Sequence, residues 1–124
     1  MVSIADIVFV DDDGDIIETA REYLSRDYDI EAFTSAESAL DFLKKQRARL
    51  LVTDLRMPGL NGFMLIDEVK AIYPDIKVLL ISGYIDATSS KERSLYEKYT
   101  PHCLSKPFRL SELLEEIRSI LECH

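Results

Sequence analysis

The sequence predicts an α/β fold, with a parallel sheet of five strands and five helices on its two faces. Short apolar runs rich in Val, Ile and Leu alternate with longer segments at helical spacing, from one end of the chain to the other. Continuous apolar runs are typical of strands that are buried on both sides, as in parallel sheets. Right-handed crossovers between such strands place the connecting helices on both faces of the sheet.

Each apolar run is a candidate strand, and we expect strands at residues 7–10, 30–33, 50–53, 78–81 and 103–105. The first helix carries Ile17, Ala20 and Leu24 on one face and extends to about Arg26. The apolar faces of three further helices are Ala36, Ala39, Leu40 and Leu43, then Leu65, Ile66, Val69 and Ile72, and finally Leu110, Leu113, Leu114, Ile117, Ile120 and Leu121.

Two of these helices have end signals of their own. Thr34 followed by Glu37 fits a capping box at the start of the second helix. Pro74 is expected to end the third helix.

The segment between Ser82 and Cys103 has the weakest pattern, and a short fourth helix is expected there from Leu95, Tyr96 and Tyr99. No repeat, low-complexity tract or linker interrupts the chain. Residues 1–124 are therefore expected to form one domain, with no output domain in this chain.

Composition argues against several classes of protein. The formal net charge of −8 argues against direct binding to nucleic acid or to an anionic membrane surface. No apolar stretch approaches the ~20 residues needed to span a bilayer, and residues 1–4 lack the pattern of a signal peptide. Cys103 and Cys123 make neither a disulfide framework nor a zinc site. A cytoplasmic location is therefore expected.

Four of the expected strands end in polar residues that form one chemically related set. They are Asp11 and Asp12 after the first strand, Asp54 after the third, Ser82 after the fourth and Lys106 after the fifth. The carboxyl ends of parallel strands share one edge of the sheet, where ligands bind. Three carboxylates, one hydroxyl and one ammonium are therefore expected to converge, a combination suited to a phosphoryl group and a metal ion.

Carboxylates at this separation repel one another. At an effective dielectric near 20, each like-charge pair about 4 Å apart costs ~4 kcal/mol. Mg²⁺ is the natural counter-charge, because it prefers oxygen ligands and is commonly held by one or two carboxylates with waters and a substrate phosphate. Asp54 is then expected to attack phosphorus as a nucleophile, while Lys106 and Ser82 hold phosphoryl oxygens.

Four segments together form a recognisable set of motifs: Val10-Asp11-Asp12-Asp13, Thr53-Asp54-Leu55-Arg56-Met57-Pro58-Gly59-Leu60-Asn61-Gly62, Ile81-Ser82-Gly83 and Lys106-Pro107-Phe108. On these motifs the chain resembles the receiver (response regulator) domain family of two-component signalling, over essentially its whole length. The resemblance implies the flavodoxin-like strand order 2-1-3-4-5. It also implies a phosphorylation-activated switch in phosphorelay signal transduction. Such a domain catalyses only its own phosphorylation and dephosphorylation.

The resemblance also assigns roles to individual residues. It implies that Asp54 accepts the phosphoryl group from a histidine kinase or a phosphotransfer protein. Asp12 would bind Mg²⁺ directly, Asp11 would act largely through water, and Asp54 and the backbone carbonyl of Arg56 would complete the metal site. Asp13 has no implied metal role and is expected to help start the first helix.

Two departures from the family pattern concern how the signal leaves the site. The aromatic residue that the family often has three positions before the lysine is Cys103 here, and Tyr99-Thr100 replaces the usual Gly-Ala pair. We assign the switch to Ser82 and Cys103 and expect the response to concentrate in residues 83–85 and the fourth helix. An output domain, a partner protein or a homodimer formed through the fourth and fifth helices would then read the change.

Two other interpretations remain open. Asp11-x-Asp13-Gly14 after a strand resembles the nucleophile motif of the haloacid-dehalogenase-like phosphatases, which would make Asp11 the nucleophile. Against this, no acidic strand end follows Lys106 to complete their metal site, and Asp54 would have no role. The other interpretation is a degenerate receiver that acts as an unphosphorylated interaction module, and the intact acidic set argues against it.

Overall fold

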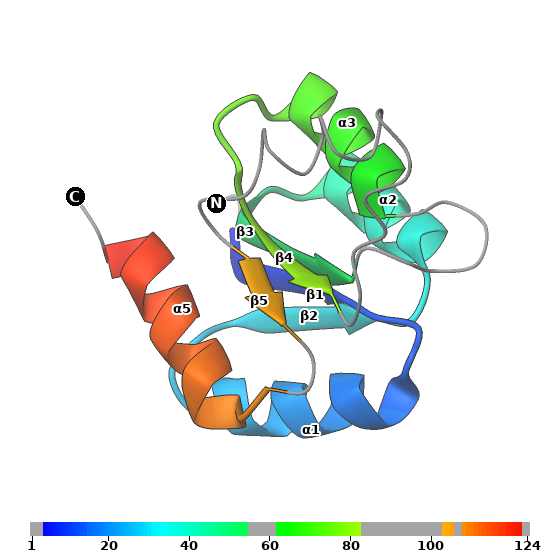
Figure 1. Cartoon of the computed structure of the whole chain (residues 1–124). Helices are drawn as coiled ribbons and strands as arrows, with labels where there is room; N and C mark the ends of the chain where they lie inside the picture. The colour runs from blue at the N-terminus through cyan, green and yellow to red at the C-terminus, as the bar shows by residue number, and fades with distance from the viewer. Residues whose placement is uncertain (1–3, 55–61, 83–102, 106–107, 123–124) are drawn as a thin grey trace.

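The computed structural model describes residues 4–54, 62–82, 103–105 and 108–122, with only the backbone described at Ser82, Cys103 and Ser105. Within these residues five parallel strands form one sheet in the order β2-β1-β3-β4-β5 (Figure 1). The strands are β1 Ala5–Val10, β2 Ile30–Phe33, β3 Ala48–Asp54, β4 Lys77–Ser82 and β5 Cys103–Ser105. The α/β class and the parallel sheet expected from the sequence are confirmed.

Helices lie on both faces of this sheet (Figure 1). The described helices are α1 Gly14–Leu24, α2 Ala36–Lys45, α3 Gly62–Ile72 and α5 Leu110–Glu122. One core cluster joins α1 and α5 to the sheet, and another joins α2 and α3 to it. The expected fourth helix falls within residues 83–102, outside the described residues, so the count of five helices stays a prediction.

The central strands are apolar along their length because both of their faces are covered. Val8 and Leu51 belong to the cluster beneath α2 and α3, whereas Phe9, Leu50 and Val52 belong to the cluster beneath α1 and α5. All five of these side chains are fully buried. Two-sided burial therefore explains why these strands lack the alternating polar residues of a half-exposed sheet.

The strand register brings the ends of β1 and β3 side by side. Val10 pairs with Thr53, so the chain leaves β1 beside the end of β3. Asp54, the last residue of β3, pairs with Ile81 of β4. Ser82 at the end of β4 in turn pairs with Ser105 at the end of β5. The ends of these four strands therefore lie along one edge of the sheet.

Two expectations about the helices are wrong in detail. The N-cap of α2 is Ser35 and not Thr34, because Ser35 has the extended backbone of a cap and its hydroxyl accepts a hydrogen bond from the amide of Ser38 at 3.2 Å. Ile72 closes α3 but is 39% exposed, so it is not part of the buried face expected for that helix. The buried residues of α1, Ile17, Ala20 and Leu24, are as expected.

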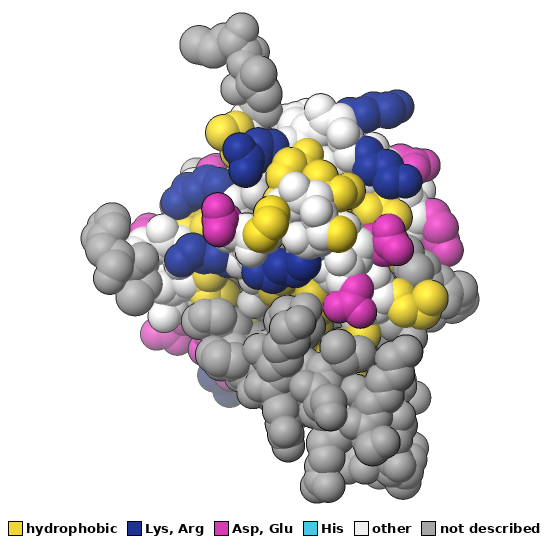
Figure 2. All heavy atoms as spheres, turned by 90° about the horizontal axis from the view of Figure 1, so that it is seen from above, with side chains coloured by type: hydrophobic (Ala, Val, Ile, Leu, Met, Phe, Trp, Pro, Cys, Tyr) yellow, Lys and Arg dark blue, Asp and Glu magenta, His cyan; other side chains and the backbone are white. Residues whose placement is uncertain are grey.

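Seen from the side of α3, the surface carries Lys and Arg side chains interspersed with Asp and Glu around a group of hydrophobic side chains (Figure 2). Charges of both signs are therefore mixed on this face. None of the helices in the described residues is long and apolar enough to cross a membrane.

Candidate metal and phosphoryl site

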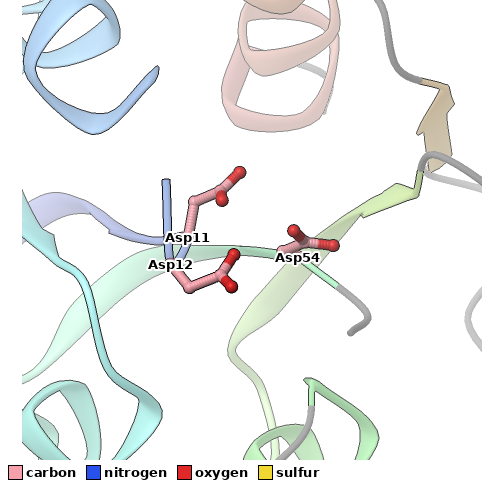
Figure 3. Close-up of side chains that lie close together, drawn as sticks. All are labelled: Asp11, Asp12 and Asp54. Atoms are coloured by element: carbon pink, nitrogen blue, oxygen red, sulfur yellow. The ribbon is translucent and has the colours of Figure 1, made fainter. Parts of the chain in front are cut away.

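Three of the predicted site residues meet at the carboxyl edge of the sheet. Asp11 and Asp12 follow β1, Asp54 ends β3, and one carboxylate oxygen from each residue lies within 4.8 Å of the others (Figure 3). Asp11 is fully buried and Asp54 is 7% exposed, whereas Asp12 is exposed. The group therefore has a buried floor, made by Asp11 and Asp54, and an open side at Asp12.

The position of Asp11 is held by contacts on two sides. Its backbone amide donates a hydrogen bond to the carbonyl of Phe33 at the end of β2, at 3.2 Å. Its Oδ1 accepts a hydrogen bond from the amide of Asp13 at 2.9 Å. Asp11 is thus tied both to the neighbouring strand and to the turn that leads into α1.

Asp54 is held by the strand that carries it. β3 is hydrogen-bonded to β1 on one side and to β4 on the other, and its pairing with β4 continues to Asp54. The hydroxyl of the preceding residue, Thr53, is fully buried and donates a hydrogen bond to the carbonyl of Asp54 at 3.0 Å. The Asp54 carboxylate therefore projects from an anchored point of the backbone.

The chemistry of these donors fits a hard divalent cation. All three side chains offer carboxylate oxygens, the ligands that Mg²⁺ prefers. Asp11 and Asp54 are buried, and their ligand oxygens lie within 4.8 Å of each other, a separation at which two negative charges repel. A cation between them would relieve this repulsion, and Asp12, which is exposed, meets the solvent on the open side.

The remaining predicted site residues lie partly or wholly outside the described part of the chain. Arg56 and Lys106 are outside it. The backbone of Ser82 ends β4 and therefore lies at the same edge as Asp54, and the backbone of Cys103 begins β5, paired with Leu80. The assigned roles of these four residues, and the switch pair Ser82 and Cys103, remain predictions.

One contact at the site was not predicted from the sequence, namely the hydrogen bond from Asp13 to Asp11. Asp13 was expected only to help start the first helix, and it is indeed the N-cap of α1. The sequence could have indicated this hydrogen bond, because the side chain of an Asp in a turn commonly accepts a hydrogen bond from the backbone amide two residues later.

Comparison with known proteins agrees with this geometry. A family model described as the response regulator receiver domain matches residues 7–118. The chain is 40% identical over 114 residues to the heme response regulator HssR of Staphylococcus aureus, a match that covers 90% of this chain and 49% of that protein. The chain therefore spans about half the length of the curated relatives it matches.

Solved structures share the fold over nearly the whole chain. A CheY-like receiver domain protein from Methanospirillum hungatei has a TM-score of 0.85 at 24% identity, with 97% of this chain and 95% of that chain covered. An adenylate cyclase structure from Rhodopirellula baltica has a TM-score of 0.83 at 27% identity, with 98% and 89% covered. The family match, together with the acidic group at the sheet edge, confirms the resemblance drawn from the sequence. The chain belongs to the response regulator receiver domains, the signalling domains of two-component systems.

Proposed function

We propose that this chain is a phosphorylation-activated switch in which Asp54 accepts a phosphoryl group in a Mg²⁺-dependent reaction. The observation that carries the proposal is the placement of Asp54, nearly buried, within 4.8 Å of two further carboxylates at the carboxyl edge of the sheet. In this proposal residues 1–124 act as one receiver domain. The chain catalyses only its own phosphorylation and dephosphorylation.

The transfer step is a substitution at phosphorus. A carboxylate oxygen of Asp54 forms the new P–O bond, and the P–N bond of a phosphohistidine donor breaks with its electron pair left on the imidazole nitrogen. Catalysis of such a step rests mainly on positioning and charge stabilisation. By family resemblance, Lys106 neutralises phosphoryl oxygens as a point charge and Ser82 donates a hydrogen bond to one of them.

The proposed cofactor is Mg²⁺, which would neutralise charge on the carboxylates and on the phosphoryl oxygens. Asp12 and Asp54 would hold it directly, Asp11 largely through water, and the backbone carbonyl of Arg56 would complete the protein ligands. The exposure of Asp12 supports direct binding from the open side, whereas the division between Asp11 and Asp54, which are both buried, rests on the family resemblance.

The proposed phosphoryl donor is a histidine kinase or a phosphotransfer protein that docks on α1. This helix begins beside the carboxylates, and it presents Asp15, Glu18 and Glu22 to solvent. A hollow of about 180 Å³ adjoins this surface, lined by Thr19, Glu22, Tyr23, Arg26 and Leu110. Tyr23 and Leu110 are only partly buried there, so the hollow offers apolar contacts beside charged ones.

The signal is proposed to leave through Ser82, Cys103 and residues 83–102, and to be read by an output domain, a partner protein or a homodimer formed through the fourth and fifth helices. The length of HssR, about twice the matched segment, supports an output region in relatives of this kind. A cytoplasmic site of action is part of the same proposal.

Incubation with acetyl phosphate and Mg²⁺, followed by intact-protein mass spectrometry, tests the proposal. The wild type should gain one phosphoryl group, Asp54→Asn should gain none, and Asp12→Asn should gain much less through loss of the metal. Asp41→Asn, at an exposed position on α2, is the matched control and should be labelled like the wild type. Undiminished labelling of Asp54→Asn would refute the assignment of the phosphoacceptor.

A further inference from the structure

Asp13 lies between the candidate metal ligands and the start of α1, and it contacts both. Its amide donates a hydrogen bond to Oδ1 of Asp11 at 2.9 Å. Its own Oδ1 accepts hydrogen bonds from the amides of Asp15 at 3.0 Å and Ile16 at 3.4 Å. Its carbonyl accepts the first bond of the helix, from the amide of Ile17 at 3.1 Å. One residue therefore joins the carboxylate of Asp11 to three amides of α1.

The position of Asp13 at the start of α1 is fixed by the fold. Asp13 has the extended backbone of an N-cap, with φ −86° and ψ 104°. The helix that it caps is fixed against the sheet by Ile17, Ala20 and Leu24, which are all buried. The orientation of the Asp13 amide is thus set by a cap that the core of the protein holds in place.

We propose that Asp13 is a positioning residue for the Mg²⁺ site, acting through its helix cap and not through its charge. The cap keeps the Asp13 amide directed at Asp11, which fixes the Asp11 carboxylate and the backbone from which Asp12 projects. This inference rests on the metal role proposed above for Asp11 and Asp12. Groups that orient metal ligands in this way typically change metal affinity by about 10- to 100-fold when they are removed.

Two substitutions separate the cap from the charge. Asp13→Asn keeps a side-chain oxygen that can cap the helix, and it removes one negative charge near the metal. Asp13→Ala removes the cap and the charge together. Asn and Asp are nearly equivalent at N-caps, whereas Ala is poor there. A residue that acted only by attracting the cation would show the same loss in both variants.

A matched control for the general loss of a helix cap exists on the same chain. Ser35 caps α2 by accepting a hydrogen bond from the amide of Ser38 at 3.2 Å. This cap joins Ser35 to Ser38 at the start of α2, whereas the three site carboxylates follow β1 and end β3. Ser35→Ala should therefore lower stability as a lost cap does, without changing the affinity for the metal.

The experiment is titration of the folded protein with Mg²⁺ alone, by isothermal calorimetry, for the wild type and the three variants. We expect Asp13→Ala to raise the dissociation constant at least about tenfold, and Asp13→Asn and Ser35→Ala to stay within a factor of about three of the wild type. If Asp13→Ala does not fold, Asp13→Gly replaces it, because Gly lacks the capping oxygen but is better tolerated than Ala at an N-cap.

Wild-type affinity in Asp13→Ala would overturn this inference and leave the proposed metal site standing. If Asp13→Ala and Asp13→Asn lose Mg²⁺ affinity equally, the inference is overturned in favour of a charge effect. If Ser35→Ala loses as much Mg²⁺ affinity as Asp13→Ala, the inference is overturned in favour of a general effect of stability. Absence of Mg²⁺ binding by the folded wild type would overturn the proposed metal site itself, and this inference with it.

Discussion

Arg49 of β3 donates a hydrogen bond from Nη2 to the backbone carbonyl of Leu121 in the last turn of α5, at 3.2 Å. The two residues are 72 positions apart in the sequence. The other terminal nitrogen, Nη1, lies 3.3 Å from the Asp6 carboxylate of β1. One guanidinium thus joins two strands to the end of a helix, where the last carbonyls have no partner within the helix and a positive charge is favoured.

Replacing Arg49 with Met should destabilise the protein by about 1 kcal/mol, the usual worth of a hydrogen bond of this kind. Met keeps the apolar stem and removes the donors, and the exposed ion pair with Asp6 adds little. Urea unfolding followed by circular dichroism measures the change. Arg118→Met is the control, because Arg118 lies 3.8 Å from Asp27 in a pair whose side chains are both about half exposed. An equal effect of the two substitutions would contradict a special role for the contact with Leu121.

A second contact at the C-terminal end of α5 should make the free energy of unfolding depend on pH in the alkaline range. The hydroxyl of Tyr28 donates a hydrogen bond to Oε1 of Glu122 at 3.4 Å. Burial, first, and then the Glu122 carboxylate raise the pKa of Tyr28 above its ordinary value of 10.0. A pKa raised by folding contributes stability that is present below pH 10 and is lost as the pH rises through the folded value.

Stability of the wild type should therefore fall more steeply above pH 10 than that of Tyr28→Phe, which has no proton to lose. Unfolding curves collected at several alkaline pH values give the comparison. Glu122→Gln should show an intermediate slope, because it removes one of the two main causes of the shift and leaves the burial. Identical slopes for the wild type and Tyr28→Phe would show that Tyr28 does not contribute to the pH dependence of stability.

Mg²⁺ should stabilise the folded protein, because the sheet brings Asp11, Asp12 and Asp54 together only in the native state. At a concentration 100 times the dissociation constant the gain would be about 2.7 kcal/mol. Thermal unfolding with and without millimolar Mg²⁺ measures it, with Asp12→Asn as the variant that should lose most of the gain. A melting temperature that does not respond to Mg²⁺ in the wild type would count against a metal at this site.

Charge reversal on α1, as in Glu18→Lys with Glu22→Lys, should slow phosphoryl transfer from the partner kinase and leave labelling by acetyl phosphate intact. Both positions are exposed, so the fold should tolerate the change. The ratio of the two labelling rates is the measurement, and Asp41→Lys on α2 is the control. A loss of the same size with both donors would show that α1 acts through folding and not through docking.

The sequence predicts the strands and helices well, because a strand that is buried on both faces appears in the sequence as a continuous apolar run. Residues such as Val8 and Leu51 must be apolar wherever helices cover both sides. The three site carboxylates were predictable for a related reason, since parallel strands end at one edge.

Other features depend on geometry that residue type does not reveal. Thr34 and Ser35 are both good caps, and only the backbone conformation of Ser35 decides between them. The contact between Arg49 and Leu121 joins an exposed side chain to a distant carbonyl, so it leaves no periodicity in the sequence. The turn that links Asp13 to Asp11 depends likewise on the backbone conformation after β1.

The central claim is that Asp54 itself carries the phosphoryl group. The most direct test is to label the wild type with acetyl phosphate and Mg²⁺, reduce the acyl phosphate with borohydride, and locate the resulting homoserine by peptide mass spectrometry. We expect homoserine at position 54, dependent on Mg²⁺ and on Asp12. Homoserine at position 11, with position 54 unmodified, would contradict the claim and favour Asp11 as the nucleophile.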